Sequence, residues 1–266
     1  MSCAPRREWP AVVNLSLPRN GTRSIAEWFR DQGAVHEGHH LTALEQILRF
    51  RAGTCSEAQL RAFFHQRQKN LDIGIDSASF MHFVADHLGD WWPKTRFIHV
   101  IREPKSWIRS YLLLLYQSGK ELMAARQRGL SPWKWMSLRA LSRRYGQLQS
   151  NGLDPVLLYE AHADGEYLQH QIGGLARHWL RTTRHILDAV PEERVFRVRL
   201  EHLGAAHGDL CDWMRVPIDE IETDQVFNRS AHTGVEAEVE RGITMCTLPS
   251  LHDSCSYYQD ILGGFR

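Results

Sequence analysis

The sequence has no apolar run long enough to cross a membrane. Its longest, Leu112–Leu115, is four leucines, whereas a spanning helix needs about 20 apolar residues. It also lacks an excess of charge, because 32 lysines and arginines stand against 31 aspartates and glutamates, giving a formal net charge of +1. A chain with this balance has no overall positive potential that would attract nucleic acid. An anion would therefore have to be bound by a local cluster of basic residues. We therefore expect neither membrane nor nucleic acid among its partners.

Cysteine is scarce and follows no pairing pattern. Five cysteines are an odd number, and none forms a C-x-x-C pair, which suits a reducing compartment better than a disulfide framework. Basic residues near the N-terminus precede no apolar stretch of the secretory type. We expect a cytoplasmic protein; its oligomeric state stays open, a homodimer being one option.

The composition is that of a globular chain, with 266 residues of which 43% are hydrophobic and 24% charged. This length is enough for one large domain with a sizeable core. We expect a single domain over residues 1–266. Within it, residues 112–177 would form an insertion serving as a lid or acceptor-side wall, and residues 227–266 a loop-rich tail.

Short apolar runs alternate with amphipathic segments along the chain. β-Branched runs of this kind are typical of strands buried on both faces of a parallel sheet. Helices alternating with such strands predict an α/β fold, a three-layer sandwich around a central, mainly parallel sheet. The expected strands are Ala11–Leu17, Leu71–Ser77, Thr95–Arg102 and Arg194–Glu201, with Val156–Tyr159 as a weaker fifth. The expected helices are Thr22–Gln32, Phe80–Leu88, Trp107–Leu130 and Leu175–Val190.

The first informative motif is the segment Pro18–Ser24, which follows the first strand. A glycine turn there opens a helix, so free backbone N–H groups and the positive end of the helix dipole would meet at one point and bind an anion. Arg19 and Arg23 flank that point and are able to add charge-assisted hydrogen bonds. A tight turn carrying two surface arginines would also explain the pattern.

This segment is not an ordinary nucleotide triphosphate loop. When the pattern G-x-x-x-x-G-K-[ST] is aligned on Gly21, Ser16 stands at the first glycine, Thr22 at the lysine and Arg23 at the Mg²⁺-binding hydroxyl. Three of the four defining positions therefore differ. We reject a Mg²⁺-dependent NTPase or kinase of the usual type.

The second motif follows the third expected strand. Arg102 ends that strand, and Ser110 lies eight residues later, about two turns into a helix that Pro104 begins. Both side chains are able to face a point beyond the carboxyl end of the sheet, where α/β folds bind ligands. An arginine fork and a hydroxyl group together suit a phosphate.

In this order the two motifs resemble those of sulfotransferases that use 3′-phosphoadenosine 5′-phosphosulfate (PAPS). The family's first motif reads Pro-[Lys/Arg]-x-Gly-Thr, as in Pro18–Thr22, and its second reads Arg-[Asp/Asn/Glu]-Pro, as in Arg102–Pro104, with a serine at the Ser110 position. A late helical tryptophan and a Glu-Asp-Leu strand end are matched by Trp179 and Glu201–Leu203, with histidine in place of aspartate.

The resemblance implies a P-loop-like sulfotransferase fold that moves a sulfuryl group from PAPS, in line, to a hydroxyl or amine of a small-molecule acceptor. The products would be 3′,5′-ADP and a sulfated acceptor, with no metal required. The loop residues implied to hold the 5′-phosphosulfate are Arg19, Asn20, Gly21, Thr22, Arg23 and Ser24. The 3′-phosphate would be held by Arg102 and Ser110. Arg19 would also be catalytic, since a cation facing the leaving oxygen stabilises the transition state more than the ground state.

Two positions depart from the family. Cytosolic relatives carry an adenine-stacking tryptophan where this chain has Ser24, and Trp28, one turn later, is better explained as core. The family's C-terminal Arg-Lys-Gly loop is absent in that form, and Arg229 or Arg241 would have to replace it.

Three residues are candidates for the base that takes the acceptor's proton. Glu37 aligns with a glutamate of relatives acting on tyrosine in proteins, and His36 beside it titrates near neutral pH. Asp76 ends the second expected strand, where it would equally cap the following helix. The sequence leaves all three open. Two other functions also remain: a non-catalytic nucleotide-binding module of the same fold, and a phosphotransferase with an atypical loop.

Overall fold

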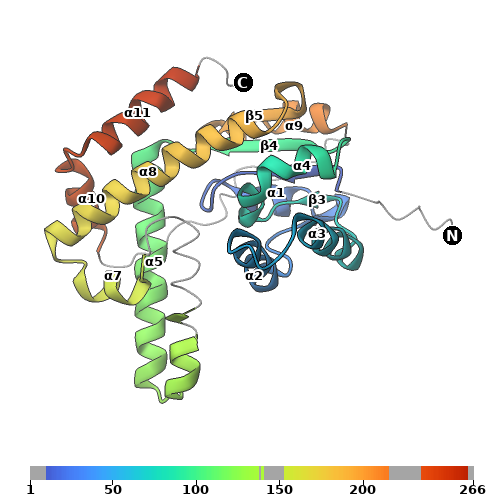
Figure 1. Cartoon of the computed structure of the whole chain (residues 1–266). Coiled ribbons are helices and arrows are strands. Elements are labelled where there is room, and N and C mark those ends of the chain that lie inside the picture. Colours follow the sequence, from blue (N-terminus) through green and yellow to red (C-terminus); the bar gives the residue numbers. More distant parts are fainter. Residues whose placement is uncertain (1–9, 138, 141–152, 216–234, 263–266) are drawn as a thin grey trace. The chain divides into compact units, whose positions relative to one another are not determined.

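The computed structural model in Figure 1 describes residues 10–137, 139–140, 153–215 and 235–262. The chain divides into two compact units. A sheet unit consists of Met1–Arg102, Thr182–Asn228 and Gly264–Arg266, and a helical unit of Glu103–Arg181 and Arg229–Gly263. This division does not test the single domain expected for 1–266, which stays a prediction.

In the described part of the sheet unit, five parallel strands lie in the order β2-β3-β1-β4-β5. They are β1 (Val12–Asn14), β2 (Ala34–Val35), β3 (Ile75–Asp76), β4 (Arg96–Ile101) and β5 (Val195–Arg199). Four of them lie within the expected ranges. The fifth expected strand is wrong: Val156–Tyr159 forms part of helix α7 (Pro155–Ala161), because Asp154 caps the backbone N–H of Val156 and Pro155 occupies the first turn.

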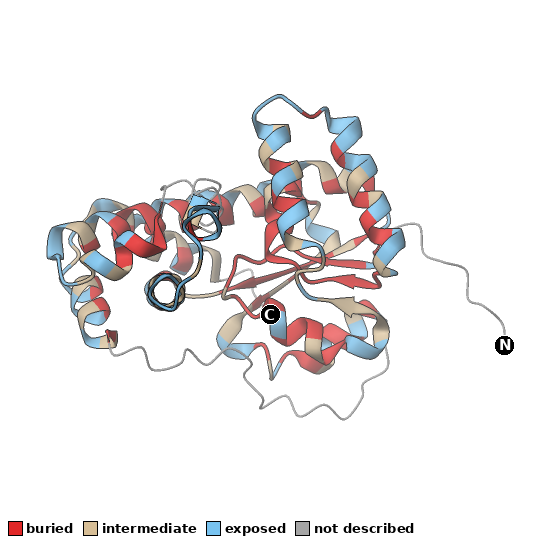
Figure 2. Cartoon of the chain, turned by 90° about the horizontal axis from the view of Figure 1, so that it is seen from below, coloured by how far each residue is buried: buried red, intermediate tan, exposed pale blue. Residues whose placement is uncertain are grey.

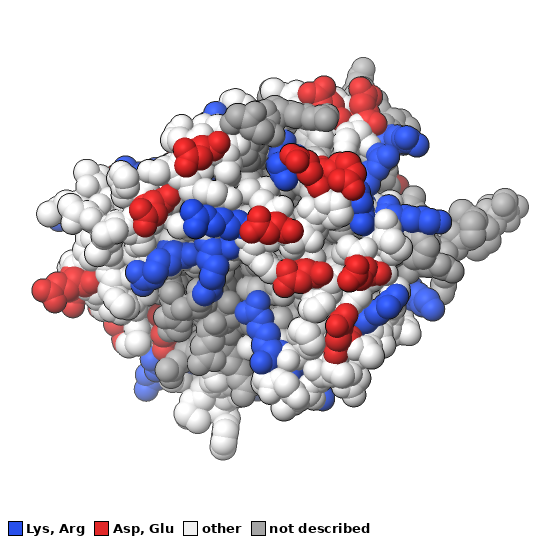
Figure 3. All heavy atoms as spheres, turned by 45° about the horizontal axis from the view of Figure 1, so that its top comes forward, with Lys and Arg blue, Asp and Glu red and all other residues white. Residues whose placement is uncertain are grey.

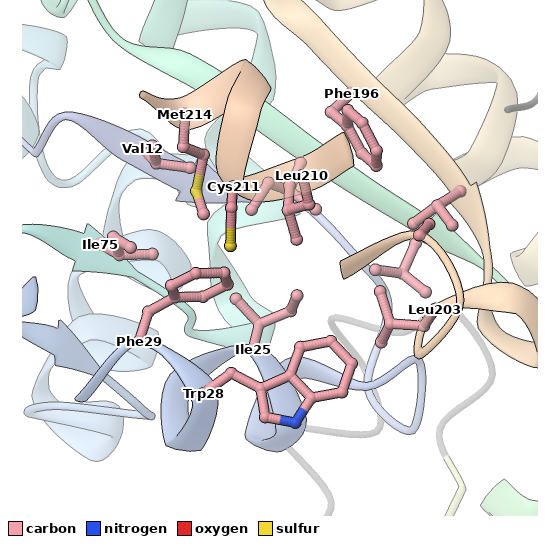
Figure 4. Close-up of a cluster of buried hydrophobic side chains, with 14 residues drawn as sticks. Val12, Ile25, Trp28, Phe29, Ile75, Phe196, Leu203, Leu210, Cys211 and Met214 are labelled. Atoms are coloured by element: carbon pink, nitrogen blue, oxygen red, sulfur yellow. The ribbon is translucent and has the colours of Figure 1, made fainter. Parts of the chain in front are cut away.

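Helices cover both faces of this sheet, which confirms the three-layer α/β sandwich. On one face, α1 (Thr22–Trp28) and α9 (His207–Met214) bury Ile25, Trp28 and Leu210 against the strands (Figure 4). Trp28 thus belongs to the core. The other face carries the 3₁₀ helix η2 (Ser79–Val84), which contacts β1. In Figure 2 the buried residues concentrate in the strands and on the helix faces that meet them.

The sheet unit contains three further complete helices and three further short 3₁₀ helices in its described residues. The helices are α2 (His40–Arg51), α3 (Glu57–Leu71) and α4 (Ala85–Trp91), with the short 3₁₀ helices η1 (Arg30–Gln32), η3 (Glu192–Arg194) and η4 (Leu200–His202). The expected helix Phe80–Leu88 is thus divided between η2 and α4.

The helical unit is built around α5 (Pro104–Gln127), which packs closely on α7. A Cβ added at Gly119 of α5 would lie only 2.0 Å from the carbonyl oxygen of Pro155, so glycine permits this approach. The unit also contains the first part of α8 (Gly165–Ala189). The expectation of a lid or acceptor wall at 112–177 stays a prediction.

The C-terminal tail is not loop-rich where it is described. It forms α10 (Glu236–Thr244) and α11 (Pro249–Ile261). Val235, Val239 and Ile243 recur every four residues and are buried, which is the spacing of one helix face. Proline at the first position then starts α11.

None of the helices in the described residues is long and apolar enough to cross a membrane. Acidic and basic side chains are interspersed over the face shown in Figure 3.

Candidate functional site

The candidate site lies at the carboxyl edge of the sheet, after β1. The strand order places β3 and β2 on one side of β1, and β4 and β5 on the other. After β1 the chain therefore first builds one half of the sheet and then crosses to the other half at β4. Open α/β sheets bind ligands at such a switch point in the strand order. Both sequence motifs begin here, one directly after β1 and one directly after β4.

Gly21 shapes the loop after β1. It caps α1 with φ of 76°, a left-handed conformation that side chains rarely adopt. A Cβ at this position would also come within 3.0 Å of the side chains of Leu200 and Leu203. Arg19 shares the positive φ, at 70°, and is a non-glycine residue held in this region. The loop is thus a tight turn fixed by the packing beneath it.

A buried polar network holds the same loop from below. Ser77 accepts a hydrogen bond from Asn14 Nδ2 at 3.0 Å and donates one to the carbonyl oxygen of Thr22 at 2.6 Å. Ser16 donates to Asn14 Oδ1 at 2.5 Å and accepts from the backbone N–H of Val100 at 2.7 Å. These residues were not among the sequence candidates, although Asn14 and Ser16 interrupt an otherwise apolar run. They link the ends of β1, β3 and β4 to the loop.

The first motif and Arg102 of the second lie together. Asn20 Nδ2 donates to the carbonyl oxygen of Val100 at 3.0 Å, and Arg102 Nη1 donates to the carbonyl oxygen of Arg19 at 3.4 Å. Burial lowers the pKa of Arg19, which shows that its charged form is partly desolvated. A desolvated cation gains from a nearby anion. Two guanidinium-bearing segments therefore meet at this edge of the sheet.

His36 faces the loop from the end of β2. Its Nε2 lies 3.3 Å from the hydroxyl oxygen of Thr22, and its side chain is 36% exposed. Burial is the main cause that lowers the pKa of His36; Arg23 and His40 lower it further, and Glu37 opposes them. The ring is therefore mostly neutral at pH 7, as a base must be.

Glu37 is more strongly engaged. Its Oε1 accepts the backbone N–H of Ser79 at 2.8 Å, and its Oε2 lies 2.5 Å from His40 Nδ1. Burial would raise the pKa of Glu37, but hydrogen bonds with His40 and Ser79 outweigh it and leave the pKa below its ordinary value. A carboxylate stabilised in this way is a weak base.

Asp76 is fully buried and forms an ion pair. Both of its oxygens accept hydrogen bonds from the Arg67 guanidinium, Oδ1 from Nη2 at 3.1 Å. Among the three expected bases, His36 alone is partly exposed, mostly neutral at pH 7 and in contact with the loop.

The other expected binding residues are differently placed. Thr22 and Ser24 are buried on the first turn of α1. Arg23 is exposed, and its Nε lies 3.9 Å from the carboxylate of Glu27. Ser110 belongs to the helical unit, where it is buried on α5. Arg229 lies outside the described residues.

Residues 11–231 match a protein family described as "Sulfotransferase domain". No curated protein matches the chain.

Solved structures similar to the chain include a sulfotransferase domain from the curacin biosynthetic pathway, at 13% identity over 95% of this chain and 98% of that one, with a TM-score of 0.47. A second is a sulfotransferase from Alicyclobacillus acidocaldarius, at 13% identity over 93% of this chain and 96% of that one, with a TM-score of 0.45. A third is the sulfotransferase domain of the Synechococcus PCC 7002 olefin synthase, at 14% identity over 96% of this chain and 97% of that one, with a TM-score of 0.37. These TM-scores lie below 0.5, so the family match alone carries the assignment.

Proposed function

The chain belongs to the sulfotransferase domain family, and we propose that it transfers a sulfuryl group from PAPS to a hydroxyl or amine of a small-molecule acceptor. One observation carries this proposal: at the carboxyl edge of the sheet, the loop Pro18–Thr22, Arg102 and a neutral histidine come together. The family match explains the two motifs, and the histidine supplies the base.

The residues present fit an anionic donor. The edge carries two arginines, of which Arg19 is partly desolvated. It also carries the first-turn N–H groups of α1, which lack a side-chain cap. This is a donor set for phosphate and sulfate oxygens. On this reading Arg19, Gly21 and Thr22 hold the phosphosulfate, and Arg102 holds the 3′-phosphate.

PAPS, when bound, supplies an activated sulfuryl group and a nucleotide leaving group. Arg19 keeps a fixed positive charge on a turn that is already formed, so little reorganisation is needed as negative charge develops beside it. Ser77 and the network around it keep the Thr22 backbone in place.

We assign the proton transfer to His36. The acceptor hydroxyl or amine would give its proton to Nε2, the ring atom that faces Thr22. Glu37, whose Oε1 lies 4.0 Å from that nitrogen, would stabilise the resulting imidazolium. We further propose that the enzyme works in the cytoplasm, on the ground of its cysteine pattern.

The test is mass spectrometry of a metabolite extract incubated with the full chain and PAPS labelled in the sulfuryl group. We expect label to appear in a small hydroxyl- or amine-bearing compound and not with heat-inactivated protein. Binding of 3′,5′-ADP without any transfer across a broad acceptor screen would instead favour a non-catalytic module. Transfer of phosphoryl from ATP would favour the phosphotransferase.

A further inference from the structure

A buried arginine lies beneath the segment that carries His36. Arg67 of α3 is only 2% exposed, and burying a guanidinium is costly unless its donors are satisfied. Two of its nitrogens bind Asp76 at the end of β3, and its Nε donates to the carbonyl oxygen of Gly38 at 2.8 Å. Its guanidinium carbon also lies 5.1 Å from the ring centre of Phe80.

The contact with Gly38 is not needed to neutralise Asp76, because the two Nη atoms already do so. It extends the ion pair to the loop between β2 and α2. Glu37 and Gly38 follow His36 directly in this loop, and a Cβ added at Gly38 would lie 2.7 Å from the side chains of Val35 and Leu71. The loop therefore rests tightly on Arg67 and its neighbours.

The loop is held by a second set of contacts as well. The Glu37 carboxylate accepts the backbone N–H of Ser79, and the backbone N–H of His40 donates to the carbonyl oxygen of Glu37 at 3.1 Å. Because Arg67 holds Gly38 and Ser79 holds Glu37, little freedom is left for residues 36–40. His36 is thereby kept within 3.3 Å of the Thr22 hydroxyl.

We propose that Arg67 is a positioning residue for His36: the Asp76–Arg67–Gly38 chain of contacts anchors the loop that presents the imidazole to the anion-binding turn. The proposal rests on the proposed function for the role of His36. It assigns Asp76 to the anchor and not to proton transfer.

The test uses Arg67→Lys in the full chain without donor or acceptor. Lysine keeps a positive charge for Asp76 but lacks the planar fork that reaches Gly38 as well. Amide hydrogen exchange at His40 and Ser79 reports the loop, and NMR titration reports the His36 ring. We expect exchange at both amides to accelerate about tenfold relative to amides in β4, the usual order of effect for one lost charged hydrogen bond. The pKa of His36 should rise toward its ordinary value.

The matched control is Arg194→Lys. Arg194 also donates to main-chain carbonyls, those of Trp92 and Thr95. These residues lie just before β4, at the amino ends of the strands, whereas Arg67 acts at their carboxyl ends. This variant should leave the His40 and Ser79 amides and the His36 titration unchanged. If Arg67→Lys alters these readouts no more than Arg194→Lys does, the proposal is wrong.

A second variant covers the case in which Arg67→Lys does not fold. Arg67→Met combined with Asp76→Leu removes both charges, and such apolar replacements of buried ion pairs are often neutral for stability. Faster exchange at His40 and Ser79 in the folded double variant supports the anchor, and wild-type protection overturns it. Because none of these measurements needs PAPS, a failure of the anchor is distinguishable from a failure to bind 3′,5′-ADP or to transfer sulfuryl groups.

Once an acceptor is identified, turnover gives a further readout. Arg67→Lys should lower kcat while leaving the KM for PAPS within about twofold, since the turn at Pro18–Thr22 is held by hydrogen bonds of Asn14, Ser16 and Ser77 that do not involve Arg67. If the KM for PAPS rises by as large a factor as kcat falls, the anchor serves donor binding and not the positioning of His36.

Discussion

At the residue scale, the site depends on which charged groups are already satisfied by the protein. Asp76 and Glu37 both accept hydrogen bonds from strong partners in the fold, and for Glu37 these leave the pKa below its ordinary value. For Arg19 and His36 the largest effect is burial, which lowers the pKa of each. Groups whose charged form is disfavoured by burial gain most from a charged ligand or from proton transfer, and they are the groups that we place in the chemistry.

Arg19 should act mainly in the chemical step. Charge beside it is larger in the transition state than in the bound donor, so Arg19→Ala should lower single-turnover rate by about 10²–10³ and donor affinity far less. Arg19→Lys keeps a cation and should retain much of the rate. Rapid-quench kinetics on folded variants check this. A normal rate with weakened PAPS binding would make Arg19 a binding residue only.

Arg102 should distinguish ligands that carry a 3′-phosphate from those that do not. Removal of its guanidinium in Arg102→Ala should weaken 3′,5′-ADP at least tenfold, since a charge-assisted contact is lost. Adenosine 5′-phosphosulfate lacks that phosphate and should bind wild type and variant alike. Calorimetric titration of both ligands provides the measurement. Because Arg102 also donates to the Arg19 carbonyl, equal losses for both ligands would assign it a structural role.

His36 should make the turnover rate fall at low pH, which is the acidic limb of the pH–rate profile. The base is active when neutral, and the pKa of His36 lies below 6.5. The rate should therefore be level near pH 7 and fall as the pH drops through the histidine's pKa. His36→Gln should lose about 10²-fold in rate together with this limb, with 3′,5′-ADP affinity kept. A pH–rate profile of the variant that retains the limb would assign the base elsewhere.

At the element scale, the apolar runs predicted the fold because strands buried on both faces are nearly continuous in apolar residues. β2 was missed because Ala34 and Val35 are too short a run to read as a strand, and only pairing with β3 defines it. Val156–Tyr159 was misassigned because four apolar residues fit a strand or a buried helix turn equally well. The cap at Asp154 and the proline after it were the signals that decide for the helix.

The site was predictable in part for the same reason. Pro18–Thr22 and Arg102 are local motifs at strand ends, and adjacent parallel strands must bring their carboxyl ends together. The Arg67–Asp76 pair and the Asn14–Ser77 bond depend instead on how α3 and the strands pack. No spacing in the sequence specifies that packing, so the sequence alone could not show which of the three candidate bases already have strong partners in the fold.

Strand β4 carries a buried titratable group that should make the fold sensitive to acid. Ile98 and Val100 face the α1–α9 core, so His99 between them points to the other face. Burial, with smaller effects of Arg197 and His82, lowers the pKa of His99 to about 3. Since the unfolded chain binds a proton near pH 6.5, stability is present above that pH and is lost as pH falls toward the folded pKa.

Urea unfolding of wild type and His99→Leu at pH 7.5 and 5.5 measures this contribution. The free energy of unfolding of wild type should fall by about 1.4 kcal/mol more than that of the variant over this interval, because only the unfolded state binds the proton in the one pH unit below 6.5. Subtracting the variant cancels the other histidines. Equal losses in the two proteins would show that His99 takes up its proton in the folded state as well.

At the scale of the whole molecule, the family match at residues 11–231 includes segments of both compact units. The sheet unit holds the loop, Arg102 and His36, whereas Ser110 lies on α5 of the helical unit. A ligand that binds the native chain and not the unfolded one stabilises the native state by mass action.

The product 3′,5′-ADP should therefore raise the thermal stability of the full chain, and Mg²⁺ should not change its affinity. At about 100 times the dissociation constant, a single site adds about 2.7 kcal/mol, which for a chain of this size is a shift of several degrees in Tm. We expect metal independence because Arg23 stands at the position of the Mg²⁺-binding hydroxyl in the loop. Melting scans with 3′,5′-ADP in EDTA and in excess Mg²⁺ test both statements, with AMP as a control that lacks the 3′-phosphate and should shift Tm less. A melting temperature that does not move, or moves only when Mg²⁺ is present, would contradict the assignment of the anion-binding turn to PAPS and favour the phosphotransferase.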